Sequence, residues 1–355
     1  MKVSDIAFEE QSEYYENFDY FTDNKVVRVL LENNVDASLW NDAFPEIENI
    51  KFDFATAIDL ADELNIVGAE GCKQLDKIGH YHLGKYLIIC KDSDYKYLSF
   101  LMRKILNQSV EDYSSSDYIF ETNVHSKENL EYYFDFIAEH FARKLYIHPS
   151  KLIDEAPWLD KFYKCFSEVL YKPLIKAVYH DFVFEESKGN HCTLNELYVC
   201  LQEMNRIPAS NLDDYHEKFF KTAEWNTFKQ KINSFESKLD DEFKVKSKLE
   251  DVEKILLELN NHGVNSRNIY LFFKGHNIEK LIFNLLKNYL IKLYEKYKQD
   301  QVSKLSGQAA DDKRRQLRNQ KVDFNIKYDK RDLGKIELFK STIIKINSLY
   351  ATKAP

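Results

Sequence analysis

Glycine and proline are scarce in this chain, which has nine glycines and six prolines among 355 residues. Collagen-like chains, β-sandwiches and β-propellers need frequent turns and use both residues more often, so this composition argues against them. No run of eighteen apolar residues occurs, and the first ten residues lack the basic and apolar pattern of a secretory signal. We therefore expect a helical protein with no transmembrane segment, located in the cytoplasm.

Cysteine is also scarce, and its number is odd. The five cysteines are scattered along the chain, at Cys72, Cys90, Cys165, Cys192 and Cys200. This pattern is typical of reduced thiols in a reducing compartment and not of a disulfide framework. It agrees with a cytoplasmic location, which is a host cell's cytoplasm if the source is an intracellular bacterium or a virus.

The familiar catalytic motifs are absent. The chain has no phosphate-binding glycine loop, no dinucleotide-binding fingerprint, no serine-hydrolase elbow and no zinc-protease motif. Two acidic groups, Asp92/Asp94 and Asp240/Asp241/Glu242, offer oxygen ligands to a divalent cation, but a solvated turn or helix face is the simpler interpretation. We expect no cofactor and no metal centre, and the sequence favours a non-enzymatic role without deciding the matter.

What the chain does contain is enough apolar material for one or two cores, at 44% of residues, together with a strong charge gradient. Residues 1–70 carry seventeen acidic and four basic side chains, whereas residues 271–355 carry nine acidic and nineteen basic ones. The gradient predicts either different partners for the two ends or an acidic N-terminal part that folds back on a basic C-terminal part.

Apolar residues recur at helical spacing along most of the chain. The predicted fold class is therefore mainly α, with one or more multi-helix bundles and a minor β element near the N-terminus. We divide the chain into an acidic N-terminal helical domain (1–150), a central helical domain (151–298), a polar linker (299–312) and a basic C-terminal helical element (313–355).

Residues 53–78 predict a helical hairpin in which Asp53 caps the first helix. The segment 52–78 resembles the C-terminal helices of BTB/POZ and Skp1-like domains; the matching residues are Leu60, Ala61, Asp62, Leu64, Ile66, Cys72 and Leu75. The resemblance implies a protein-interaction adaptor, with a ubiquitin-ligase subunit as the expected partner. The apolar residues Leu60, Leu64 and Ile66 are then the expected partner contacts.

An alternative from a different class is a host-directed thiol enzyme with Cys192 as its nucleophile. Thr193 and Glu196 match a capping box, so Cys192 is expected just before a helix, where the helix dipole favours a thiolate. Such an enzyme also needs a histidine base, and the candidates are His140, His148 and His180.

A third interpretation is binding of nucleic acid or another anionic surface through a basic segment near the C-terminus. Five cationic residues fall within nine positions: Lys313, Arg314, Arg315, Arg318 and Lys321. Clustered cations of this kind contact phosphates, but they also form ordinary solvated helix faces.

Overall fold

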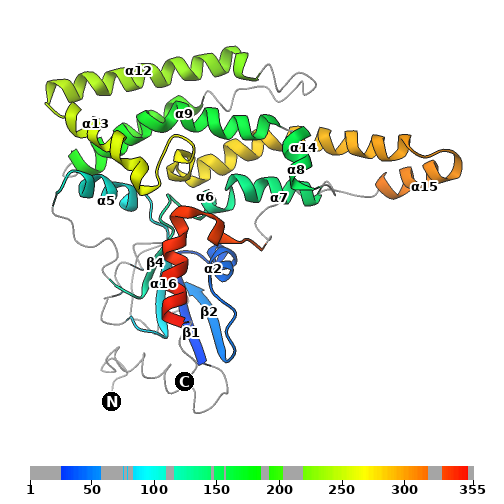
Figure 1. The fold of residues 1–355 in the computed structure, drawn as a ribbon, viewed down its shortest axis with the longest axis horizontal. Coiled ribbons are helices and arrows are strands. Elements are labelled where there is room, and N and C mark those ends of the chain that lie inside the picture. Colours follow the sequence, from blue (N-terminus) through cyan, green and yellow to red (C-terminus); the bar gives the residue numbers. More distant parts are fainter. Residues whose placement is uncertain are drawn as a thin grey trace. The chain divides into compact units, whose positions relative to one another are not determined.

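The structure is a computed structural model that describes residues 25–56, 75, 78, 83–108, 116–144, 148–155, 157–184, 192–202, 219–318 and 330–350. The chain is mainly α-helical with a small parallel sheet near the N-terminus, which confirms the predicted fold class (Figure 1). Among the described helices, none has both the length and the apolar character needed to cross a membrane.

The described residues form two compact units, and their boundaries differ from the predicted ones. The first, here called the sheet unit, takes its residues from 1–100, 109–130 and 330–355. The second, the helical unit, takes its residues from 101–108 and 131–329. The C-terminal residues therefore belong with the N-terminal strands and do not form a separate element.

The sheet unit is built on four parallel strands in the order β2-β1-β3-β4. Its elements are β1 (Lys25–Leu31), α2 (Ala37–Ala43), β2 (Ile50–Thr56), β3 (Leu87–Lys91), β4 (Ile119–Glu121), α6 (Lys127–Glu131) and α16 (Lys340–Tyr350), and α5 (Lys96–Ile105) continues into the helical unit. The chain adds β2 on one side of β1 and then β3 and β4 on the other. The strand order therefore reverses between β1 and β3.

The two central strands are apolar on both faces, as expected for a covered parallel sheet. In β1, Val29, Leu30 and Leu31 are fully buried, and the residues of β3 from Leu87 to Cys90 are buried as well. Leu30 and Ile89 belong to a cluster with Leu75, Ile78, Leu83 and Leu87. Helix α2 and the 3-10 turn Glu337–Phe339 just before α16 supply further apolar contacts, including Trp40 against Phe339 at 5.8 Å between ring centroids.

Strand β2 shows that the predicted helix cap at Asp53 is wrong. Asp53 lies within the strand, and its carboxylate accepts a hydrogen bond of 2.5 Å from the Arg28 guanidinium on β1. The neighbouring Phe52 and Phe54 both contact Phe44, with ring centroids 4.5 and 6.0 Å apart. Tertiary packing and strand pairing therefore override the helical spacing seen in the sequence.

The helical unit is centred on the long helix α9 (Pro157–Tyr179), against which α10, α12 and α13 pack. The other helices are α7 (Phe134–Lys144), α8 (Pro149–Glu155), α10 (Cys192–Leu201), α12 (Ala223–Val245), α13 (Leu249–Glu258), α14 (Gly275–Ser303) and α15 (Gly307–Arg318). Phe166 of α9 lies at the centre of the core, with ring contacts to Phe162, Phe228 and Phe273. A single π-helical turn, His180–Phe184, follows α9.

Residues 299–312, for which the sequence predicts a polar linker, are helical except for a short turn. Helix α14 runs to Ser303, and α15 begins at Gly307, whose φ of 56° suits glycine. Helix α15 contacts α14 and buries Ala310 and Leu317. The polar composition therefore reflects exposed helix faces around a tight turn.

Candidate functional site

Acidic residues follow two neighbouring strands of the sheet at the point where the strand order reverses. Glu32 is the first residue after β1, and Asp92 is the first residue after β3. In parallel sheets the carboxyl ends of all strands lie at one edge, and ligands bind there, where the strand order reverses. The topology therefore identifies this edge as the candidate functional site.

Hydrogen bonds join the segments that leave the strands. The backbone N–H of Asp92 donates to Oε1 of Glu32 over 3.1 Å, which ties the ends of β1 and β3 together. The backbone N–H of Lys127, at the start of α6, donates to Oδ1 of Asp92 over 2.9 Å. The Lys127 ammonium, itself buried, forms an ion pair with Asp36.

Five carboxylates lie within electrostatic reach of one another at this edge, and we call them the edge carboxylates: Glu32, Asp36, Asp92, Asp94 and Glu128. Asp36 and Glu128 are buried, whereas the side chain of Asp94 is 54% exposed. One hydrogen bond, of 2.6 Å, joins Glu128 to the hydroxyl of Ser126. The group thus extends from the buried ends of the strands to solvent.

The surroundings of these carboxylates favour their neutral form. Burial raises the pKa of Glu32 to about 7, and the nearby Asp94 and Asp36 add to the shift against the opposing hydrogen bond from Asp92. Burial also raises the pKa of Asp92 well above its usual range, and Glu32 and Glu128 raise it further. Burial raises the pKa of Asp36 as well, even though Lys127 opposes the shift. Carboxyl groups that are held close together although burial and mutual repulsion disfavour their charged forms are typical of functional sites.

A network of buried polar side chains holds the edge in place. The Ser93 backbone N–H donates to the Thr122 hydroxyl over 3.1 Å, and the Asn123 backbone N–H donates to the Ser93 hydroxyl over 2.8 Å. The side chain of Asn123 then reaches α16, donating to the hydroxyls of Ser341 and Thr342. The loops after β3 and β4 are therefore fixed to each other and to the C-terminal helix.

The edge offers hard oxygen ligands, the kind that Mg²⁺ and Ca²⁺ prefer. Within the described ranges, no three His, Cys, Asp or Glu side chains already surround a single point at metal-binding distance. Protein-bound Mg²⁺ keeps several of its waters and takes one or two carboxylates together with substrate phosphates. The arrangement therefore fits a cation that binds together with a phosphate better than it fits a closed structural metal site.

The sequence identified two of these residues and missed three. Asp92 and Asp94 are the two that the sequence offers as cation ligands; the half-buried Asp92 accepts a backbone hydrogen bond from Lys127, and Asp94 is exposed. Glu32, Asp36 and Glu128 were missed. The available signal for Glu32 was an acidic residue placed directly after a buried apolar run, which is also how Asp92 follows β3.

The second acidic group has a different environment, because each of its carboxylates faces a cation. Asp240 lies 2.6 Å from the buried Lys176 ammonium, and Asp241 lies 3.4 Å from Lys244. Glu242 contacts both His180 and Lys246. These residues form ion pairs on α12, which agrees with the interpretation of a helix face.

Cys192 is exposed at the start of α10, and the three candidate histidines lie in different surroundings. Nδ1 of His180 contacts Thr193 at 2.8 Å and Asp181 at 3.1 Å, and its Nε2 contacts Glu242 at 3.2 Å. His140 is buried within α7 against Phe141, whereas His148 bonds to the exposed Ser150 hydroxyl. None of these histidine contacts involves the Cys192 thiol.

The predicted capping box at Thr193 and Glu196 is wrong. The helix already includes Cys192. The backbone N–H of Leu194 donates a hydrogen bond of 2.9 Å to the carboxylate of Asp181. The Thr193 hydroxyl instead contacts His180. A carboxylate distant in sequence therefore takes the role predicted for a local side chain.

The remaining predicted residues are only partly described. Leu60, Leu64 and Ile66 lie outside the described residues, so the adaptor function stays a prediction. In the basic segment, Arg314, Arg315 and Arg318 are exposed on α15, Lys313 is half-buried, and Lys321 lies outside the described residues. Arg314 forms an ion pair of 2.7 Å with Asp311, one turn earlier.

Comparisons with protein-family models, with curated proteins and with solved structures found no match to this chain.

Proposed function

We propose that the sheet unit is a phosphoryl-transfer enzyme that uses a divalent cation, bound at the carboxyl edge of the sheet, to act on a phosphate ester. One observation carries the proposal. Glu32 and Asp92 leave the two strands that flank the reversal of strand order, and a hydrogen bond of 3.1 Å joins them. Three further carboxylates lie close enough to raise their pKa values.

The electrostatics favour the binding of a cation at this edge. Five carboxylates share the edge, and of the nearby ammonium groups Lys127 is paired with Asp36 and Lys91 lies 3.6 Å from Glu121. Without a cation, several of these groups must take up protons or repel one another. A bound divalent cation would relieve the repulsion between the carboxylates. The free energy that this repulsion costs the folded protein would then contribute to the affinity for the cation.

The chemistry then follows from the parts present. Glu32, Asp92 and Asp94 are the residues expected to hold the cation through their carboxylate oxygens. A cation held there would neutralise a phosphate oxygen of the substrate and would lower the pKa of a water bound to it. In the hydrolysis that this arrangement would support, water forms the new P–O bond as the P–O bond to the leaving group breaks, the water's proton passes to solvent, and the leaving oxygen gains a proton.

The test compares wild type with Asp92→Asn, which keeps the shape of the side chain and removes its charge. Binding of Mg²⁺ and Mn²⁺ is measured by calorimetry, and hydrolysis of bis(p-nitrophenyl) phosphate and of single-stranded DNA is measured with each cation. We expect Asp92→Asn to weaken cation binding at least about tenfold and to slow hydrolysis about a hundredfold. Melting curves without cation should show that the variant is folded.

Asp241→Asn is the matched control, because Asp241 is an exposed carboxylate on α12 whose side chain is 78% exposed. It should leave cation binding and hydrolysis unchanged. Wild-type protein that binds neither cation at millimolar concentration would contradict the proposal. So would hydrolysis that proceeds equally well in a chelator.

A further inference from the structure

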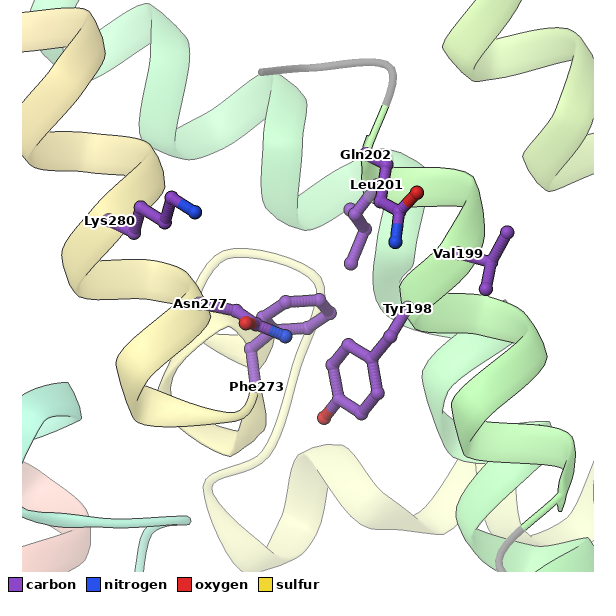
Figure 2. A pocket seen from close by; sticks show the side chains of 7 residues that line it. All are labelled: Tyr198, Val199, Leu201, Gln202, Phe273, Asn277 and Lys280. Carbon is purple, nitrogen blue, oxygen red and sulfur yellow. The ribbon is translucent and has the colours of Figure 1, made fainter.

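A small pocket in the helical unit lies between the end of α10 and the beginning of α14. It has a volume of about 230 Å³, and its lining includes Tyr198, Leu201, Gln202, Phe273, Asn277 and Lys280. Figure 2 shows the side chains of Lys280 and Asn277 extending from α14 toward those of Tyr198 on α10 and of Gln202, which directly follows α10. The pocket belongs to a different compact unit from the edge carboxylates.

The apolar side of the pocket is rigid. Phe273 is fully buried, and its ring packs edge to face against Tyr198 with centroids 4.9 Å apart. The backbone N–H of Lys274 donates to the Tyr198 hydroxyl over 3.0 Å, which fixes the phenol ring from its far end. Leu201 is also buried and completes this surface. A planar ligand would therefore meet a preformed aromatic and aliphatic wall.

The polar side of the pocket consists of the side chains of Gln202, Asn277 and Lys280. Across the described ranges, the side chains of Gln202, Asn277 and Lys280 take part in no hydrogen bond or ion pair. The two amides each offer a donor and an acceptor, and the ammonium offers a positive charge. Three polar groups that converge on an apolar wall are the usual composition of a small-molecule site.

The combination of groups narrows the class of ligand. Aromatic walls stack with nucleobases, and Asn or Gln amides recognise the paired donors and acceptors on the edges of bases. A nearby lysine suits the phosphate that accompanies the base. The pocket is smaller than the roughly 300–1,000 Å³ of sites for drug-sized ligands, so it fits a single ring system.

We infer that this pocket binds one nucleotide, with the base against Tyr198, the base edge near Gln202 and Asn277, and the phosphate paired with Lys280. The same chemistry is presented by a free mononucleotide and by one unpaired residue of a single-stranded nucleic acid. The inference does not depend on the cation site.

The experiment measures binding of AMP, CMP, adenosine and a five-residue single-stranded DNA to the full chain by calorimetry. Wild type should bind the mononucleotides about tenfold more tightly than the uncharged nucleoside, because only they carry a phosphate. Lys280→Glu should remove this difference. Tighter binding of the oligonucleotide than of AMP or CMP would identify a nucleic-acid strand as the source of the nucleotide, and the reverse would identify free nucleotides.

Lys296→Glu is the matched control, because Lys296 is an exposed lysine further along the same helix. It makes the same change of charge and should leave binding unaltered. Equal effects of the two substitutions would overturn the inference, as would wild-type protein that binds none of the four probes. Melting curves of both variants should show that they are folded. Wild-type protein that binds nucleotides but hydrolyses no DNA with either cation would contradict the cation-site proposal alone.

Discussion

At the scale of single residues, Glu32 is the side chain that connects structure to function most directly. Its pKa of about 7, raised first by burial and then by neighbouring carboxylates, means that near neutral pH it is half protonated. A folded-state pKa above the ordinary value also means that, without a cation, stability falls as the pH rises from about 4.5 to 7. A bound cation must displace the proton and therefore reverses this trend.

This gives a pH prediction for cation binding. As the pH rises toward 7 the affinity for Mg²⁺ should increase by at least about tenfold per pH unit, because the cation displaces the proton of Glu32 and any proton held by Asp92. Above pH 7 the Glu32 proton no longer contributes to this dependence. Calorimetry in buffers of different ionisation enthalpy measures the proton release directly.

The control for this prediction is Glu32→Gln, which has no carboxyl proton to lose. It should bind Mg²⁺ more weakly than wild type at pH 8, with a shallower dependence on pH. An unchanged pH profile in Glu32→Gln would show that another group of the edge titrates in this range.

At the scale of helices and strands, the sequence predicted some elements well and others poorly, for physical reasons. The helical turn Leu259–His262, which follows α13, ends at Gly263, and this residue has a φ of 79° that few residues other than glycine adopt. Local backbone chemistry decides such an ending, so the sequence alone suffices. Strand β2 was not predicted because its contacts are with residues outside the strand. Phe52 packs against Phe44 and Asp53 pairs with Arg28, and the spacing of apolar residues within the segment shows neither contact.

Helix α12 shows how a buried charge fixes the packing of two helices. The Lys176 ammonium on α9 is buried and lies 2.6 Å from both Glu236 and Asp240 on α12. The buried residues of α12 are otherwise apolar and include Trp225, Phe228 and Ile232. The ion pairs thus set the register of α12 against α9, within an otherwise apolar contact.

Lys176→Met should destabilise the helical unit by about 3 kcal/mol, because it leaves two carboxylates beside a face from which water is largely excluded. Urea denaturation followed by circular dichroism measures the loss. Lys238→Met is the matched control, because Lys238 forms an exposed pair with Glu196 and should contribute less than about 1 kcal/mol. Equal losses in the two variants would contradict the role assigned to Lys176.

At the scale of the whole molecule, the charge gradient has a structural counterpart. Near the C-terminus, Lys330 lies 3.1 Å from Glu46, and the buried Arg331 lies 3.6 Å from Asp42. Charge composition thus anticipated that acidic N-terminal residues meet basic C-terminal ones. The division of the chain into two units was not predicted, because it depends on contacts between residues about 300 positions apart.

The candidate site was hard to predict for the same reason. Its five carboxylates come from three separate stretches of chain, and only the strand order brings Glu32 beside Asp92. The sequence shows that acidic residues follow apolar runs, but it does not show that two of these runs are neighbours. The parallel pairing of β1 with β3 supplies that information.

The two compact units lead to a prediction about unfolding. Mg²⁺ at about a hundred times its dissociation constant should stabilise the sheet unit by about 2.7 kcal/mol, because it binds only the folded edge. For a unit of this size, the corresponding melting transition should rise by several degrees, whereas the transition of the helical unit should not move. Differential scanning calorimetry with and without MgCl₂ measures both. Asp92→Asn should abolish the shift, and a single transition that moves as a whole would show instead that the two units unfold together.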